Sequence, residues 1–189
     1  MFQQETEMKK AWMLACAAGL SLAACDTADE PKAATETAAA AAGENTLASG
    51  LGKDSRLAAA VKAAGLEPAL AGPTPYTLLA PSDAAFNKLP AGVSDRLMQE
   101  EGRTELTAVL TAHILPGTML AADIAKAVDA SGGKAQIRTL GGGTLTVTRN
   151  GDRLQFADAA GTVASVTGAD DKRSNGIIHH IDAVLMPAS

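Results

Sequence analysis

The segment Pro75–Pro90, with the sequence PYTLLAPSDAAFNKLP, decides the fold expected for this chain. Its first part, Tyr76–Ala80, is a short apolar run bounded by prolines, which is typical of a buried strand. Ser82 can begin a helix, because its hydroxyl accepts a backbone N–H bond at a helix N-terminus, and Asp83 follows where the helix dipole favours a carboxylate. Phe86 lies one turn further on and points back toward the core. The segment therefore predicts a buried strand joined directly to a short helix.

This segment closely resembles the first signature of the fasciclin domain, the repeat module of fasciclin and of the periostin-type adhesion proteins. A block near the C-terminus, Asn175–Pro187 (NGIIHHIDAVLMP), resembles the second signature, and Leu110–Gly117 (LTAHILPG) resembles the central segment. The resemblance identifies residues 47–189 as a fasciclin domain. It implies an α+β fold, in which a β-sandwich or wedge of short strands carries a packed layer of helices. The residues at the signature positions are Pro81, Ser82, Asp83, Phe86, Asn175, Gly176, His179 and Asp182.

Hydrophobic periodicity along residues 47–189 also predicts helices first and strands later, which is a pattern of α+β domains. Helical spacing of apolar residues, together with cap and stop signals, indicates helices at residues 54–64, 66–70, 82–88, 94–100, 103–113 and 121–130. Alternating patterns then indicate strands at residues 136–140, 144–149, 153–157, 163–167 and 177–186, with a tight turn at Asn150-Gly151 and a polar loop at residues 170–175.

Residues 1–25 have the features of a bacterial signal peptide. Met8-Lys9-Lys10 precedes an apolar run, residues 11–24, that is too short to cross a bilayer as a permanent helix. The acidic residues between Met1 and Met8 do not fit this pattern, so we expect translation to begin at Met8. The sequence therefore predicts an exported protein.

Leu22-Ala23-Ala24-Cys25 resembles a bacterial lipobox, in which the cysteine is acylated and becomes the first residue of the mature protein. An acyl chain contributes about 0.8 kcal/mol per buried CH₂ group, so acylated Cys25 is expected to hold the protein at a lipid bilayer without a spanning helix. An ordinary signal peptide with a coincidental cysteine is the alternative. The domain would lie in the periplasm or at the cell surface.

Residues 26–46 contain five acidic residues, one lysine and no large apolar residue. Such a segment buries too little apolar surface to offset the entropy lost on ordering, so we expect a flexible acidic tether. Cys16 leaves with the signal peptide and Cys25 is acylated. The mature domain is therefore expected to have no disulfide, although its destination is oxidising.

The overall composition argues against a nucleic-acid partner. The formal net charge is −5 and the pI is about 5.2, whereas nucleic-acid binding depends on clustered Lys and Arg. Aromatic residues make up only 3% of the chain, so we expect an aliphatic core and few stacking platforms for sugars.

The three histidines are the main candidates for chemistry. His179 and His180 are adjacent in a predicted strand, so their side chains point to opposite faces and cannot readily bind one metal ion. His179 shares its face with apolar residues and is predicted to be buried, whereas His180 is expected to form a surface pair with Asp182. His113 lies on an apolar helix stripe, which favours a structural role over a ligand role.

In animal members of the fasciclin family, a Tyr-His pair and a nearby Asp-Ile pair are linked to integrin binding. The matching residues here are Ala112-His113 and Asp123-Ile124. The resemblance therefore implies binding positions at His113, Asp123 and Ile124, with Ala112 in place of the tyrosine.

The familiar catalytic templates do not match. The chain has neither a G-x-S-x-G elbow nor a phosphate-loop lysine, and Gly141–Gly143 fits a turn before a strand. Asp170-Asp171 lacks the oxygen spacing of a calcium loop, and Glu100-Glu101 is expected to face solvent. We expect no catalytic residue, no metal and no cofactor.

The sequence as a whole predicts a non-catalytic adhesion or binding module of the bacterial envelope. Its partners would be the lipid bilayer, through Cys25, and an unidentified envelope or surface protein or polysaccharide. The alternatives are an envelope enzyme or small-ligand carrier with a polar site near His113 and His180, and a structural envelope protein without a dedicated ligand.

Overall fold

A computed structural model describes residues 45–52, 55–90 and 92–187 of the chain. The chain divides into two compact units, Met1–Pro31 and Lys32–Ser189, and all described residues belong to the second. The predicted signal peptide, Cys25 and residues 26–44 of the predicted tether lie outside the described residues. Asn45 and Thr46, which the sequence assigned to the end of the tether, belong to the folded body: Thr46 is 8% exposed, and the Asn45 carbonyl accepts the backbone N–H of Ser174 at 2.8 Å.

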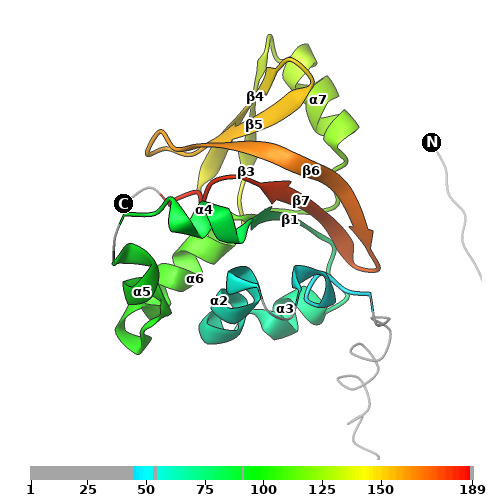
Figure 1. Ribbon diagram of the computed structural model, residues 1–189. Helices are drawn as coiled ribbons and strands as arrows, with labels where there is room; N and C mark the ends of the chain where they lie inside the picture. The colour runs from blue at the N-terminus through cyan, green and yellow to red at the C-terminus, as the bar shows by residue number, and fades with distance from the viewer. Residues whose placement is uncertain (1–44, 53–54, 91, 188–189) are drawn as a thin grey trace, which may run out of the picture. The chain divides into compact units, whose positions relative to one another are not determined.

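The sheet contains seven strands: β1 (Tyr76–Pro81), β2 (Ile114–Pro116), β3 (Lys134–Arg138), β4 (Thr144–Asn150), β5 (Arg153–Ala157), β6 (Val163–Arg173) and β7 (Gly176–Ile181). Their order is β2-β1-β7-β6-β5-β4-β3 (Figure 1). Only β1 and β7 run parallel, and the other neighbours are antiparallel. Just after β3, the Leu140 N–H donates to the Ile114 carbonyl of β2 at 2.8 Å. The two edges of the sheet therefore meet, and the sheet curls nearly into a barrel.

Helices cover this sheet in two places. A layer of five helices lies beside β1 and β7, and it consists of α2 (Arg56–Ala64), α3 (Glu67–Ala71), α4 (Asp83–Asn87), α5 (Val93–Met98) and α6 (Arg103–Ala112) (Figure 1). The sixth helix, α7 (Ala121–Ala130), packs on β3 and β4 at the other end (Figure 1). Two 3₁₀ helices, η1 (Ser49–Leu51) and η2 (Glu100–Gly102), complete the described elements. The predicted α+β class is thus confirmed.

The strand and helix predicted from Pro75–Pro90 are both present, as β1 and α4. The Ser82 hydroxyl accepts the N–H of Ala85 at 3.3 Å, so it caps α4 as predicted, and Phe86 is 7% exposed. Asp83 has a second role that the sequence did not indicate. Its Oδ1 accepts the backbone N–H of Arg56 at 2.9 Å, which ties the start of α4 to the start of α2.

The other predicted elements are confirmed within about two residues, with two exceptions in the last third of the chain. β6 continues to Arg173, through residues predicted to form a polar loop, because it pairs with β7 across register shifts at Gly168 and before Asp171. β7 ends at Ile181 and not at Met186. Pairing with the strand that follows overrides local polarity at these positions. The tight turn predicted at Asn150-Gly151 is present one residue later, at Gly151-Asp152, because Asn150 still pairs with Arg153; Gly151 has φ 62.

The domain has two hydrophobic clusters, and the central strands contribute to both. Leu78 of β1 and Ile178 of β7 belong to the cluster under the helical layer, whereas Leu79 and Ile181 belong to the cluster inside the curled sheet. This two-sided burial explains why β1 is apolar along its whole length. Within the described residues, none of the helices is both long and apolar enough to span a membrane.

Candidate functional site

The two signature blocks meet as the parallel pair β1–β7. Tyr76 pairs with Gly176 at the start of the pair, and Pro81 pairs with Ile181 at its end. At Gly176 the backbones come so close that an added Cβ atom would lie 2.1 Å from the Tyr76 carbonyl oxygen. This position therefore requires glycine, because the two main chains leave no room for a side chain.

Asn175 is a buried hydrogen-bonding centre immediately before this pair. Its Oδ1 accepts the N–H of Leu47 at 2.8 Å, and its Nδ2 donates to the carbonyls of Leu70 and Gly72 at 2.8 and 2.7 Å. The residue is 6% exposed. Asn175 therefore joins the segment around Leu47, the end of α3 and the start of β7, and its role is structural.

Asn175→Ala is expected to lower the free energy of unfolding by about 3 kcal/mol, because it removes the partner of two buried backbone groups and of the partly buried Gly72 carbonyl, and each buried loss costs about 1–3 kcal/mol. Urea unfolding of the purified chain measures this. The matched control is Asn87→Ala on the exposed side of α4, which is expected to change stability by less than about 0.5 kcal/mol. Equal effects of the two substitutions would contradict the assigned role of Asn175.

His113 caps the C-terminus of α6 and is 1% exposed, which confirms the predicted structural role. Its Nδ1 lies 2.7 Å from the Val109 carbonyl, and its Nε2 lies 3.0 Å from the Leu185 backbone nitrogen. Because a carbonyl only accepts and a backbone N–H only donates, the ring is neutral with its proton on Nδ1. Burial lowers the pKa of His113 to about 4, against the opposing effects of the Val109 hydrogen bond and the charge of Asp158.

His179 also forms an internal link, as its apolar surroundings predicted. Its Nε2 donates to the Met119 carbonyl at 2.9 Å, its Nδ1 accepts the N–H of Asp170 at 3.2 Å, and the ring is 1% exposed. Burial is the main cause of a lowered pKa at His179. Asp170 has φ 59 in the irregular part of β6, and its carboxylate accepts the N–H of Ala121 at 2.8 Å. His179 and Asp170 together therefore hold the start of α7 against the sheet.

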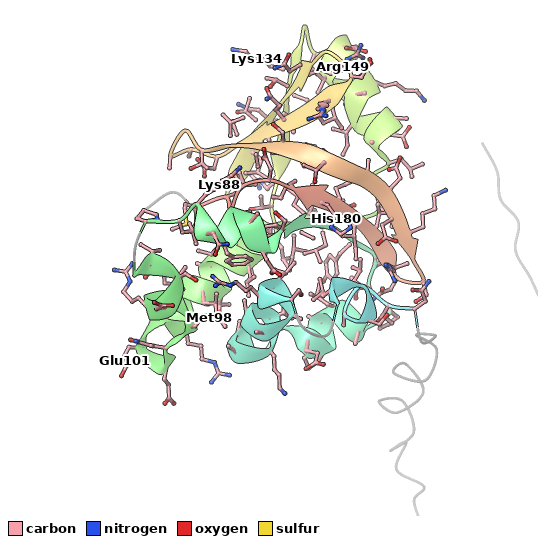
Figure 2. All side chains as sticks on the ribbon, in the orientation of Figure 1. Lys88, Met98, Glu101, Lys134, Arg149 and His180 are labelled. Atoms are coloured by element: carbon pink, nitrogen blue, oxygen red, sulfur yellow. The ribbon has the colours of Figure 1, made fainter. Side chains whose placement is uncertain are left out.

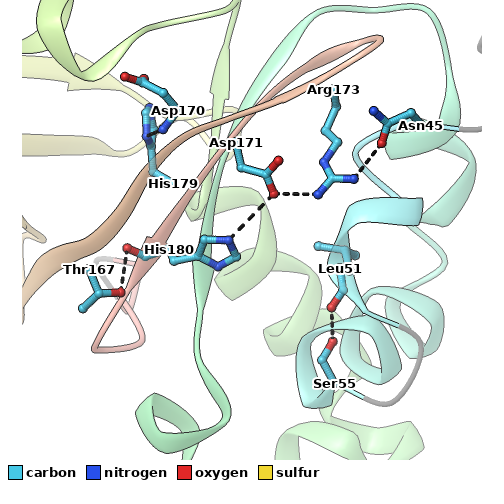
Figure 3. Close-up of polar contacts among 9 residues, drawn as sticks. All are labelled: Asn45, Leu51, Ser55, Thr167, Asp170, Asp171, Arg173, His179 and His180. Carbon is cyan, nitrogen blue, oxygen red and sulfur yellow. Dashed lines mark hydrogen bonds and ion pairs between the residues drawn. The ribbon is translucent and has the colours of Figure 1, made fainter.

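His180 lies on the other face of β7, and its predicted pairing with Asp182 is wrong. Figure 3 shows its Nε2 directed at Asp171 of β6, 3.9 Å from the carboxylate oxygen. Asp171 in turn binds Arg173 at 2.6 Å, and Arg173 donates to the Asn45 side chain at 2.7 Å (Figure 3). The strand pairing decides this, because β6 lies beside β7 and Asp171 pairs with Ile178, two residues from His180 on the same face of β7.

Asp182 instead bonds to β6, just after the end of β7. Its Oδ1 accepts the N–H of Ser165 at 2.7 Å, and its own N–H donates to the Ser165 carbonyl at 3.2 Å. Lys88 of α4 donates to the Asp182 carbonyl at 2.8 Å. This signature aspartate therefore fastens the end of β7 to β6 and to α4.

The structure separates the family-motif positions. His113 is buried at the end of α6, whereas Asp123 and Ile124 lie on α7, at the other end of the domain (Figure 1). Ile124 is 3% exposed and faces the sheet. Asp123 is on the outer surface and lies 3.5 Å from Lys126. Of the three, only Asp123 presents its side chain to solvent.

Glu100 and Glu101 are acidic residues at the surface, whereas His113 and His179 are buried. Glu100 and Glu101 are exposed in η2, as predicted, and Glu101 is labelled in Figure 2. Within residues 45–52, 55–90 and 92–187, no three His, Cys, Asp or Glu side chains come together in a group that could hold a metal ion. The alternative hypothesis of an enzyme or small-ligand carrier placed His113 and His180 near one polar site. The two histidines share no hydrogen-bond partner.

Comparison with known proteins places this geometry in a family. Residues 53–187 match the fasciclin domain. The chain is 36% identical to protein sll1483 of Synechocystis sp., in an alignment that covers 70% of this chain and 67% of that protein. It is 37% identical to transforming growth factor-beta-induced protein ig-h3 of Sus scrofa, in an alignment that covers 70% of this chain and only 18% of that protein. A FAS1 domain pair from the insect cell adhesion molecule Fasciclin I has a similar fold, with a TM-score of 0.65 and 19% identity, over 74% of this chain and 50% of that one. The chain belongs to the fasciclin domain family.

Proposed function

We propose that this protein is an exported, lipid-anchored binding module that displays one fasciclin domain at the bacterial envelope. The domain would act without catalysis, by adhesion to an envelope or surface protein or polysaccharide. The observation that carries this proposal is the family membership over residues 53–187, combined with a lipobox-like sequence ending at Cys25. One structural relative comes from an insect cell adhesion molecule, which supports adhesion as the kind of activity.

The roles of the two buried histidines support a non-catalytic function. His113 and His179 each use both ring nitrogens in contacts with backbone groups. A general base needs a free ring nitrogen within reach of substrate, so neither ring is available for that task. The contacts of these two histidines are therefore accounted for by folding.

The anchor is tested by localisation. Cys25→Ser is expected to move most of the protein from the membrane fraction to the soluble fraction, because serine has no thiol to acylate. Fractionation and immunoblotting of intact cells measure the shift. Cys16→Ser is the matched control and is expected to leave the protein in the membrane fraction. Unchanged membrane association of Cys25→Ser would refute the anchor.

Binding is tested with the Cys25→Ser chain, purified and labelled, on envelope preparations. We expect saturable binding that unlabelled chain competes away. Pretreatment of the envelopes with protease or with periodate distinguishes a protein partner from a polysaccharide partner, since each reagent destroys one of them. Binding that does not saturate would contradict a specific module.

A further inference from the structure

The helical layer contains a cavity of about 200 Å³ that neither the signature blocks nor the proposed adhesion explains. It lies among α4, α5, α6 and the segment after β7. The neutral His113 ring forms part of its wall and has both nitrogens engaged elsewhere. The buried apolar residues of the wall are Pro81, Phe86, Leu97, Leu106, Val109, Leu110 and Val184.

The remaining four lining residues, Arg56, Ser94, Asp95 and Met98, are all at least partly exposed and form the mouth. Met98 is 41% exposed and lies on α5 (Figure 2). The mouth therefore offers one cation, one anion and one hydroxyl above an apolar interior. A ligand that suits both parts has an apolar body and a single polar, uncharged end, because the opposite charges of Arg56 and Asp95 leave the mouth without a net charge to compensate a charged group.

We propose that this cavity binds an uncharged monocyclic aromatic molecule with one hydroxyl group, the class represented by p-cresol. An apolar cavity of about 150 Å³ is large enough to bind benzene, so the space here accommodates one substituted ring. Three lining residues favour an aromatic body over a saturated one: Phe86 through ring–ring contact, Met98 through its sulfur and Arg56 through its cation. Asp95 and Ser94 can bond the ligand hydroxyl.

The surroundings of the mouth favour a small molecule over a protein partner. A stable protein interface covers about 800 Å² on each side and has an apolar centre. Among the described residues, the exposed large hydrophobic side chains are Met98, Leu140 and Val163, and only Met98 borders this cavity. Nearby, Arg96 and Glu105 form an exposed ion pair at 2.9 Å. Among the described residues, Met98 is therefore the single large apolar side chain that is exposed at the mouth, which is too little for the apolar centre of a protein interface.

The test is a titration of the full chain carrying Cys25→Ser, purified without detergent, with p-cresol. Saturable binding is expected with a dissociation constant of about 0.1–1 mM, in the range for a ligand of this size. Calorimetry gives the affinity, and amide shifts in NMR spectra give the location, which is expected along α4, α5 and α6. The saturated analogue 4-methylcyclohexanol is expected to bind at least about threefold more weakly.

Two substitutions of exposed residues complete the test. Met98→Trp is expected to weaken p-cresol binding at least about tenfold, because the larger side chain fills the mouth, while the thermal midpoint stays near that of the parent. Leu140→Trp, at a residue 45% exposed and away from the cavity, is expected to bind p-cresol like the parent. Absence of saturable binding, equal affinity for the saturated analogue, or unchanged binding by Met98→Trp would overturn the proposal. These measurements do not depend on the envelope partner, so the adhesion proposal and the cavity proposal can be refuted independently.

Discussion

Gly176→Ala is expected to lower the free energy of unfolding by about 3 kcal/mol or more, because overpacking against an immobile backbone lies at the upper end of steric substitutions. The new Cβ atom would lie 2.1 Å from the Tyr76 carbonyl oxygen and 2.9 Å from the Leu47 side chain. Relief requires β1 and β7 to separate, and these parallel strands border both hydrophobic clusters. Urea unfolding at neutral pH measures the loss.

The matched control for this substitution is Gly143→Ala, before β4. A Cβ atom there would meet only the Thr139 hydroxyl, at an ordinary 3.5 Å. We expect its stability to stay within about 1 kcal/mol of the parent. If Gly176→Ala were as stable as Gly143→Ala, the close approach of β1 and β7 would be refuted.

The second large effect is the part of the acid-induced loss of stability that originates at His113. The lowered pKa of His179 also reduces stability on acidification. Burial lowers the pKa of His113 from 6.5 to about 4 in the folded protein. Between these values the unfolded chain binds a proton at His113 that the folded chain does not, so stability rises with pH and is lost as the pH falls from about 6.5 to about 4. The difference corresponds to about 3 kcal/mol, fully lost at and below pH 4.

This effect is measured as the free energy of unfolding in urea from pH 4 to pH 7, for the parent and for His113→Gln. The variant is expected to be less stable at pH 7, because it loses contacts to Val109 and Leu185, and to show a flatter dependence on pH. His180→Gln is the control at an exposed histidine and is expected to keep the slope of the parent. Identical slopes for parent and His113→Gln would show that His113 does not carry the effect.

The candidate site was predictable only in part. The sequence indicated that His113 and His179 are buried, because apolar neighbours share their faces. It did not indicate their partners: Leu185 is 72 residues from His113, and Asp170 was expected in a loop and not in the paired strand β6. Arg173 was missed for the same reason: a charged residue in a polar stretch gave no sign that it would reach Asn45, 128 residues away.

By itself the sequence determined the family of this protein and most of its helices and strands, but not the short strand β2. Alternation marks strands, a period of 3.6 marks helices, and a cap such as Ser82 acts within three residues of its own position, so all these signals are local. The tertiary structure decided the length of β6, the partner of His180 and the cavity beside Met98. The length of β6 and the partner of His180 depend on the register of the β6–β7 hairpin, and the cavity depends on segments far apart in the chain. These contacts arise only when the apolar faces pack together and fix which polar groups lie across from one another.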